Sequence, residues 1–231
     1  MKLRLSAVVL LALTLVFGGC ASKPQLPINA SADLLNAKTT KIAVVMTTLP
    51  KVDTQFPGAG CLLCMAAASM TNSTLTSYVQ TLPADEVAQI PVEMTKILRA
   101  RGLDAVAITT PLDLKTLPDA SKVEPNFARK DFSALKAKYQ VDKVLVLEIQ
   151  ALGVWRNYAN YIPAGAPQAV FRASGYIVNL TNNSLEWYAP VNVVKPTDGQ
   201  WDEPPKFPGL TNAYFQALET GRETLTKPFA Q

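Results

Sequence analysis

The segment Val141-Asp-Lys-Val-Leu-Val-Leu-Glu-Ile149 is predicted to form the central strand of a β-sheet. Its residues from Val144 to Leu147 are apolar at successive positions. A strand with one solvated face alternates apolar and polar residues, whereas a strand that is covered on both faces does not. We therefore expect the rest of the domain to be arranged around this strand, with helices packed on the sheet.

Helix and strand patterns alternate on the N-terminal side of this segment. Lys41–Thr47 and Leu103–Thr109 have the apolar, β-branched composition of strands. Ala84–Arg101 and Ala128–Tyr139 have apolar residues at three- and four-residue steps, which predicts a helix in each. Pro91 lies inside the first of these helices and is expected either to begin its regular part or to kink it.

Hairpins are predicted on the C-terminal side. The central strand is expected to continue toward Tyr158, turn through residues 162–167 and return along 169–180. A further strand is predicted at 185–194 and a final helix at 210–225. The element order is then β-α-β-α-β-β-β-α, which predicts an α/β (α+β) fold with a mixed sheet covered by helices.

The start of the chain has the pattern of a secretory signal. Lys2 and Arg4 precede the mostly apolar run at 7–17, which is too short to span a bilayer as a stable helix. The sequence Phe17-Gly-Gly-Cys20 resembles the lipobox of bacterial lipoproteins, which implies acylation (palmitate) of Cys20. Ala21 in place of Asp implies sorting to the outer membrane, on its periplasmic side. The alternative is an ordinary cleaved signal with a chance cysteine.

Three regions follow from this pattern. Residues 1–19 are the expected signal peptide, and the polar, proline-containing residues 20–40 are an expected lipidated tether. Residues 41–231 are expected to form a single domain.

Composition excludes several functions. The chain has no histidine, which removes Ser-His-Asp and Cys-His catalysis and the usual zinc sites. Loss of Lys2 and Arg4 with the signal leaves 20 cations (22 − 2) against 18 anions, without the basic surface that nucleic acids require. We therefore expect no enzyme activity, no metal, no cofactor and no nucleic-acid partner.

The stretch from Thr54 to Ala84 contains no charged residue and includes the pair Cys61 and Cys64. The favoured interpretation is a buried loop and helix start with a local disulfide. A second is a surface that meets the membrane or another subunit, because exposed apolar patches mark interaction sites. A redox-active pair is a third, although no neighbouring cation would lower a thiol pKa. In the second case the contact residues would be Leu62, Leu63 and Met65.

Four aromatic residues, Trp155, Tyr158, Tyr161 and Trp201, are candidates for a partner contact. The first three lie near the distal end of the predicted hairpin. Trp and Tyr are enriched at interface hot spots, but they also pack across strands. Both interpretations remain open at the level of sequence.

Two further segments carry a resemblance to a known group of proteins. Val141-Asp-Lys143 opens a strand after a helix, and Gly175-Tyr-Ile-Val-Asn-Leu-Thr-Asn-Asn-Ser-Leu-Glu-Trp187 follows it. This pattern resembles bacterial lipoproteins with a domain like the N-terminal domain of TolB, including the curli secretion, Pel polysaccharide and penicillin-binding-protein-activator lipoproteins. The resemblance covers roughly Lys41 to Val194, and Asn182-Asn183 replaces the usual Thr-Gly turn.

The resemblance implies a non-catalytic envelope component that binds envelope proteins or assembles with copies of itself. Two alternatives are a subunit of an oligomeric ring or export channel, and a thiol-disulfide protein that uses Cys61 and Cys64. Pore formation is not favoured, because Pro57-Gly-Ala-Gly60 fits the alternation of membrane strands poorly.

Overall fold

The computed structural model describes residues 23–199 and 201–230 and contains a six-stranded mixed sheet. Five strands follow the order β3-β1-β4-β7-β8, and the short β2 pairs with the end of β4. The predicted fold class is therefore confirmed. The strands are β1 Lys41–Thr47, β2 Val52–Gln55, β3 Asp104–Leu112, β4 Lys143–Trp155, β7 Gln168–Asn179 and β8 Leu185–Pro196.

β4 is the middle strand of this order, as predicted from its continuous apolar run. It pairs in parallel with β1, where Val44 lies opposite Leu145, and antiparallel with β7, where Leu145 lies opposite Ile177. The side chains of Val144 to Leu147 are completely buried. The strand therefore joins a parallel half of the sheet to an antiparallel half.

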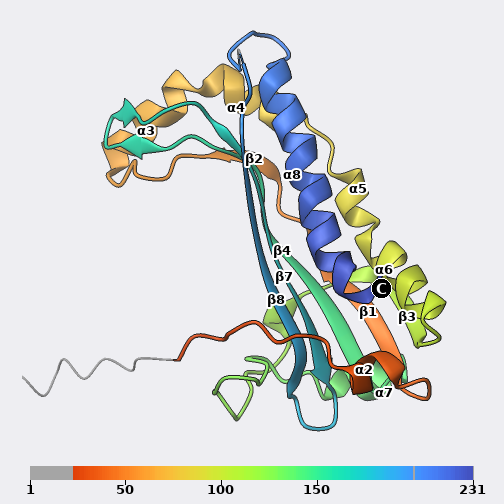
Figure 1. Cartoon of the computed structure of the whole chain (residues 1–231). Helices are drawn as coiled ribbons and strands as arrows, with labels where there is room; N and C mark the ends of the chain where they lie inside the picture. Colours follow the sequence, from red (N-terminus) through yellow and green to blue (C-terminus); the bar gives the residue numbers. More distant parts are fainter. Residues whose placement is uncertain (1–22, 200, 231) are drawn as a thin grey trace, which may run out of the picture.

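Two helices cover one face of the sheet (Figure 1): α6 Ile90–Ala100 against β1 and β3, and α8 Pro208–Thr226 against β7 and β8. The helix predicted over 84–101 is divided into α5 Asp85–Ala88 and α6, and Pro91 lies in the first turn of α6. Proline is well accommodated there because the first amide groups of a helix have no partner within it. Pro91 thus begins the regular helix and does not kink it.

The helix predicted over 128–139 is shorter than expected. Only α7 Ala134–Tyr139 is helical, and the preceding chain is a loop packed on the second sheet face. The Asn183 amide donates to the carbonyls of Ala128 and Lys130 at 3.1 and 2.8 Å and accepts from the Phe132 amide at 3.1 Å. A distant side chain therefore satisfies the backbone that a helix would otherwise satisfy.

The described part of the expected tether packs on the domain, which corrects the prediction for residues 28–40. Ile28 and Tyr188 exchange two backbone hydrogen bonds of 2.9 and 3.0 Å. The short helix α2 Ala32–Asn36 is capped by Ser31 and buries Leu34, which is 3% exposed. Cys20 and the signal lie outside the described residues. No described helix is long and apolar enough to cross a membrane.

A lateral extension leaves the sheet where β4 ends and β7 begins, next to the end of β8 (Figure 1). We define the arm as residues 56–71 and 156–167. It contains α3 Leu62–Thr71 and a small hairpin of β5 Tyr158–Ala159 and β6 Ile162–Pro163. The following helix, α4 Ser73–Val79, buries Leu75 and Val79 in the body. The helix start expected in the uncharged stretch is present at Leu62, but most of α3 is exposed rather than buried.

Candidate contact surface on the arm

The arm has a small core of its own. Five side chains form it, and the Phe56 and Tyr158 rings meet edge to face with their centroids 5.8 Å apart. Tyr158 is 6% exposed, so it is a packing residue and not the surface contact that was one of its two predicted roles. The members of this core are Phe56, Ala59, Cys64, Ala68 and Tyr158.

Polar contacts hold the base of the arm. The buried Asn72 amide donates to the Tyr158 hydroxyl at 2.6 Å and to the Ala68 carbonyl at 2.7 Å. The Arg156 guanidinium donates to the side-chain oxygen Oδ1 of Asn72 and lies over the Trp201 ring, 5.0 Å from its centroid. These contacts tie α3, the hairpin and the loop before α8 into one unit.

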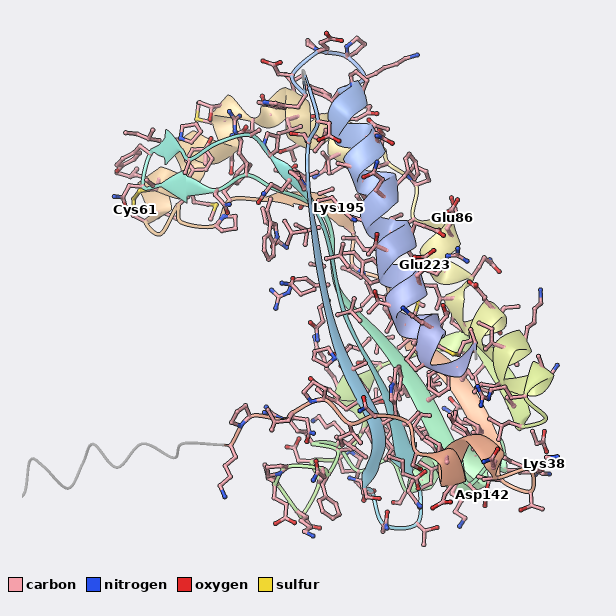
Figure 2. All side chains as sticks on the ribbon, in the orientation of Figure 1. Lys38, Cys61, Glu86, Asp142, Lys195 and Glu223 are labelled. Atoms are coloured by element: carbon pink, nitrogen blue, oxygen red, sulfur yellow. A yellow bond between two sulfur atoms is a disulfide. The ribbon has the colours of Figure 1, made fainter. Side chains whose placement is uncertain are left out.

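A disulfide joins Cys61 and Cys64 at the outer end of the arm, where Figure 2 labels Cys61. The Cys61 sulfur also accepts a hydrogen bond from the Cys64 amide at 2.9 Å and one from the Tyr161 hydroxyl at 3.6 Å. It therefore caps α3 and links this helix to the hairpin. The structure contains the local disulfide expected from the sequence; whether it is also redox-active is a separate prediction.

The arm exposes a group of large apolar side chains. Leu62 and Leu63 are 87% and 71% exposed, and Met70 is 77% exposed. No charged residue occurs in the sequence from 54 to 84 or from 157 to 171. The outer part of the arm therefore carries no charged side chain beside these apolar residues. We call the following six side chains the apolar surface of the arm: Leu62, Leu63, Met65, Met70, Tyr161 and Ile162.

Not all predicted contact residues reach this surface. Tyr161 lies there beside Cys61, together with the predicted Leu62, Leu63 and Met65. Trp155 is half-buried at the base of the arm, where its indole N–H donates to Gln55 at 2.9 Å. Trp201 is half-buried against the main core.

Met70 and Ile162 belong to the apolar surface but were not among the predicted residues. Met70 lies in the same uncharged stretch as Leu62 and Leu63, so the missing charge was a usable signal. Ile162 is far from that stretch in sequence and joins it only because the hairpin folds back toward α3.

The arrangement is thus a mixed α/β domain with a projecting arm that exposes uncharged, apolar side chains. No protein-family model matches the sequence, and no curated protein matches it. Three solved structures resemble it with TM-scores of 0.38, 0.31 and 0.29. The first is protein XCC0632 from Xanthomonas campestris, with 12% identity over 81% of this chain and 85% of that one.

The second is the PelC dodecamer from Paraburkholderia phytofirmans, with 14% identity over 89% of this chain and 94% of that one. The third is lipoprotein GNA1162 from Neisseria meningitidis, with 13% identity over 78% of this chain and 99% of that one. These three structures are similar to this chain in outline only.

Proposed function

We propose that this protein is a lipid-anchored, non-catalytic component of the bacterial cell envelope that binds a partner protein through the apolar surface of its arm. The observation that carries the proposal is the exposure of Leu62, Leu63 and Met70 on an extension whose only charged residue, Arg156, lies at its base. Exposed apolar patches mark interaction sites, and interface cores are depleted of charge and enriched in Met and Tyr.

The composition of the arm favours a protein partner over the bilayer surface. Helices that lie in a membrane interface carry Lys and Arg on their polar face, which attract anionic lipids. α3 has Ser69 and Thr71 among its exposed polar residues and no cation. The partner surface should therefore be apolar and uncharged, because an unpaired charge buried against this surface would be costly.

Anchoring is proposed through Cys20, on the periplasmic side of the outer membrane. Its support is the signal pattern that ends in Phe17-Gly-Gly-Cys20, followed by Ala21. We expect a labelled fatty acid to be incorporated into the wild type and not into Cys20→Ala. Persistent labelling of the variant would contradict the anchor, and a density gradient that places the protein in the inner membrane would contradict the sorting.

The absence of histidine from the chain supports a non-catalytic role. Within residues 23–199 and 201–230 there is also no cluster of three or more His, Cys, Asp or Glu residues that could hold a metal ion. Histidine is the most frequent general base, and metal-assisted hydrolysis needs a set of metal ligands.

The contact is tested by photo-crosslinking in cells. A photoreactive residue is placed at Leu63 or at Ile162, and at Phe215 of α8 as an exposed apolar control. We expect one protein adduct of the same mass from the two arm positions and none from the control. The partner is then purified, and its binding should be lost with the double substitution Leu63→Ser and Ile162→Ser.

Other outcomes separate the alternatives. Adducts with only a second copy of the chain would support an oligomeric assembly in place of a different partner. Adducts with lipid alone, or equal adducts from Phe215, would overturn the proposed role of the arm.

A further inference from the structure

A second candidate site lies away from the arm, on the sheet face opposite α6 and α8. It is a groove with a volume of about 500 Å³, within the range that holds small molecules. Strands β4, β7 and β8 form its floor, and the loop before α7 forms its wall. The floor residues are Glu148, Gln150, Ser174, Tyr176 and Tyr188.

The floor is polar because the sheet's second face loses its apolar cover here. The inward positions Val144 and Val146 of β4 are buried beneath α7 and its loop, and the next residue on that face is Glu148. On β7 the side chain of Ser174 accepts a hydrogen bond from Gln150 at 2.9 Å. Hydrogen-bonding groups from two strands thus converge on one cavity.

Glu148 is a partly buried carboxylate without a cationic partner. Its hydrogen bond is from the Tyr176 hydroxyl at 3.5 Å, and none of the ion pairs among the described residues includes it. Burial raises the pKa of Glu148, and the Tyr176 hydrogen bond opposes this effect. Glu186, by contrast, is paired with Lys143 and accepts from Asn179 at 2.8 Å. A cationic group of a ligand would offset the desolvation cost of the partly buried, unpaired Glu148 carboxylate.

The aromatic rings of the groove would also favour a cationic ligand group. Ammonium groups are attracted to the faces of aromatic rings. One lining ring already has such a contact, since the ammonium group of Lys122, a residue outside the groove lining, lies 3.6 Å from the centroid of the Phe127 ring. Tyr176 and Tyr188 supply two further rings beside Glu148.

The loop that forms the wall carries two cations, Arg129 and Lys130, whose charge is opposite to that of the Glu148 carboxylate. Lys130 is paired with Asp119 at 2.6 Å, whereas Arg129 is exposed and forms no ion pair with a described residue. Arg129 and Glu148 line the same cavity but are not paired with each other. An anionic group near Arg129 and a cationic group at Glu148 could therefore be bound together.

We propose that this groove binds a small zwitterion of the amino-acid type, with its ammonium group at Glu148, its carboxylate at Arg129 and an apolar body against the walls. Leu114, Phe127 and Phe132 provide the apolar lining. Each charged end of such a ligand meets an opposite charge, and charge-assisted hydrogen bonds are among the stronger ones. The site is independent of the arm and of the proposed partner contact.

The test is a matched ligand series measured by calorimetry on the full chain in detergent. The probes are L-phenylalanine, phenethylamine, which lacks the carboxylate, and 3-phenylpropionate, which lacks the ammonium group. We expect L-phenylalanine to bind most tightly and 3-phenylpropionate most weakly. Equal affinity of L-phenylalanine and 3-phenylpropionate, or no binding of L-phenylalanine at about 10 mM, would overturn the proposal.

Variants assign each end of the ligand. Glu148→Gln should weaken L-phenylalanine and phenethylamine about tenfold or more, as expected for loss of a charge-assisted bond. Arg129→Gln should weaken L-phenylalanine and leave phenethylamine unchanged. Glu86→Gln is the control, because Glu86 is exposed on α5 and lies outside the groove. Melting curves of each variant confirm folding, and a Glu148→Gln variant that is folded and binds as the wild type refutes the site.

Discussion

The body and the arm are stabilised in different ways. The body buries long strands beneath α6 and α8, and its largest core cluster includes Trp187, Phe171 and Tyr214. The arm has a core of five side chains and depends on the hydrogen bonds of Asn72 and on one disulfide. Apolar residues in the body therefore contribute to stability, whereas the outermost apolar residues of the arm contribute little to it.

The largest effect is expected in the body, for Trp187→Ala. Trp187 is 2% exposed, packs edge to face with Phe229 and lies against Gly175. Its loss should lower the free energy of unfolding by about 3–5 kcal/mol, measured by urea denaturation. A loss below about 1 kcal/mol would mean that the core of the body does not make the main contribution to the free energy of unfolding.

A smaller, local effect is expected for Tyr158→Phe. The variant keeps the ring against Phe56 but removes the hydroxyl that accepts from the buried Asn72 amide. An unsatisfied buried group costs about 1–3 kcal/mol. Hydrogen exchange should accelerate in α3 and remain unchanged in β4. Equal acceleration in both would show that the arm and body unfold as one unit.

The disulfide is expected to contribute less. A loop of this length gives at most about 2 kcal/mol in the chain-entropy model. We expect Cys61→Ser with Cys64→Ser to lower stability by no more than that amount and to loosen the start of α3. Thiol trapping directly from cells should find both cysteines oxidised. If both thiols label without reduction, the structural disulfide is wrong; reductase activity would support the redox alternative.

The apolar surface itself should have almost no effect on stability. Leu63 is 71% exposed, so Leu63→Ser should change the free energy of unfolding by no more than about 0.5 kcal/mol while partner binding is lost. Leu75→Ser on α4 is the buried counterpart, at 4% exposure, and should unfold the protein. If Leu63→Ser also unfolds it, the arm surface is part of a core.

The smallest effect concerns the groove and depends on pH. Burial raises the pKa of Glu148, because the folded protein favours the protonated carboxyl. The folded state is therefore more stable when Glu148 is protonated, and this stability is lost as pH rises and the carboxyl ionises. Glu148→Gln should therefore gain stability relative to the wild type between about pH 4 and pH 7. Tyr176, Tyr188, Arg129 and Lys130 also line the groove and are unchanged in this variant. A constant difference across the range would contradict the desolvation of Glu148.

The sheet was predictable because its signals are local. The continuous apolar run of β4 indicated a strand with two covered faces, and the steps of Ile90, Met94 and Leu98 indicated the buried side of α6. β2 was missed, since four residues that pair only with the end of β4 give too short a pattern. The loop before α7 was predicted as helix because its partner, Asn183, is distant in sequence.

The apolar surface of the arm was predictable only in part. The missing charge pointed to Leu62, Leu63 and Met65, but sequence did not decide whether they were buried. That outcome depends on how much of α3 the β5–β6 hairpin covers, which is a tertiary property. Tyr158 and Tyr161 are three residues apart, yet one is buried in the arm core and the other is 55% exposed.

The pairing of Ile28 with Tyr188 sets how far the body can stand from the membrane. If the lipid is on Cys20, seven residues lie between it and Ile28, and the eight residue steps span at most about 28 Å. A free tether up to residue 40 would reach more than twice as far. Tyr188 lies near the start of β8, whereas the arm leaves from the other end of the sheet, about 26 Å further along the strand. With the proposed lipid on Cys20, the end of the sheet near Tyr188 would face the bilayer, and the arm, at the other end of the sheet, would point away from it.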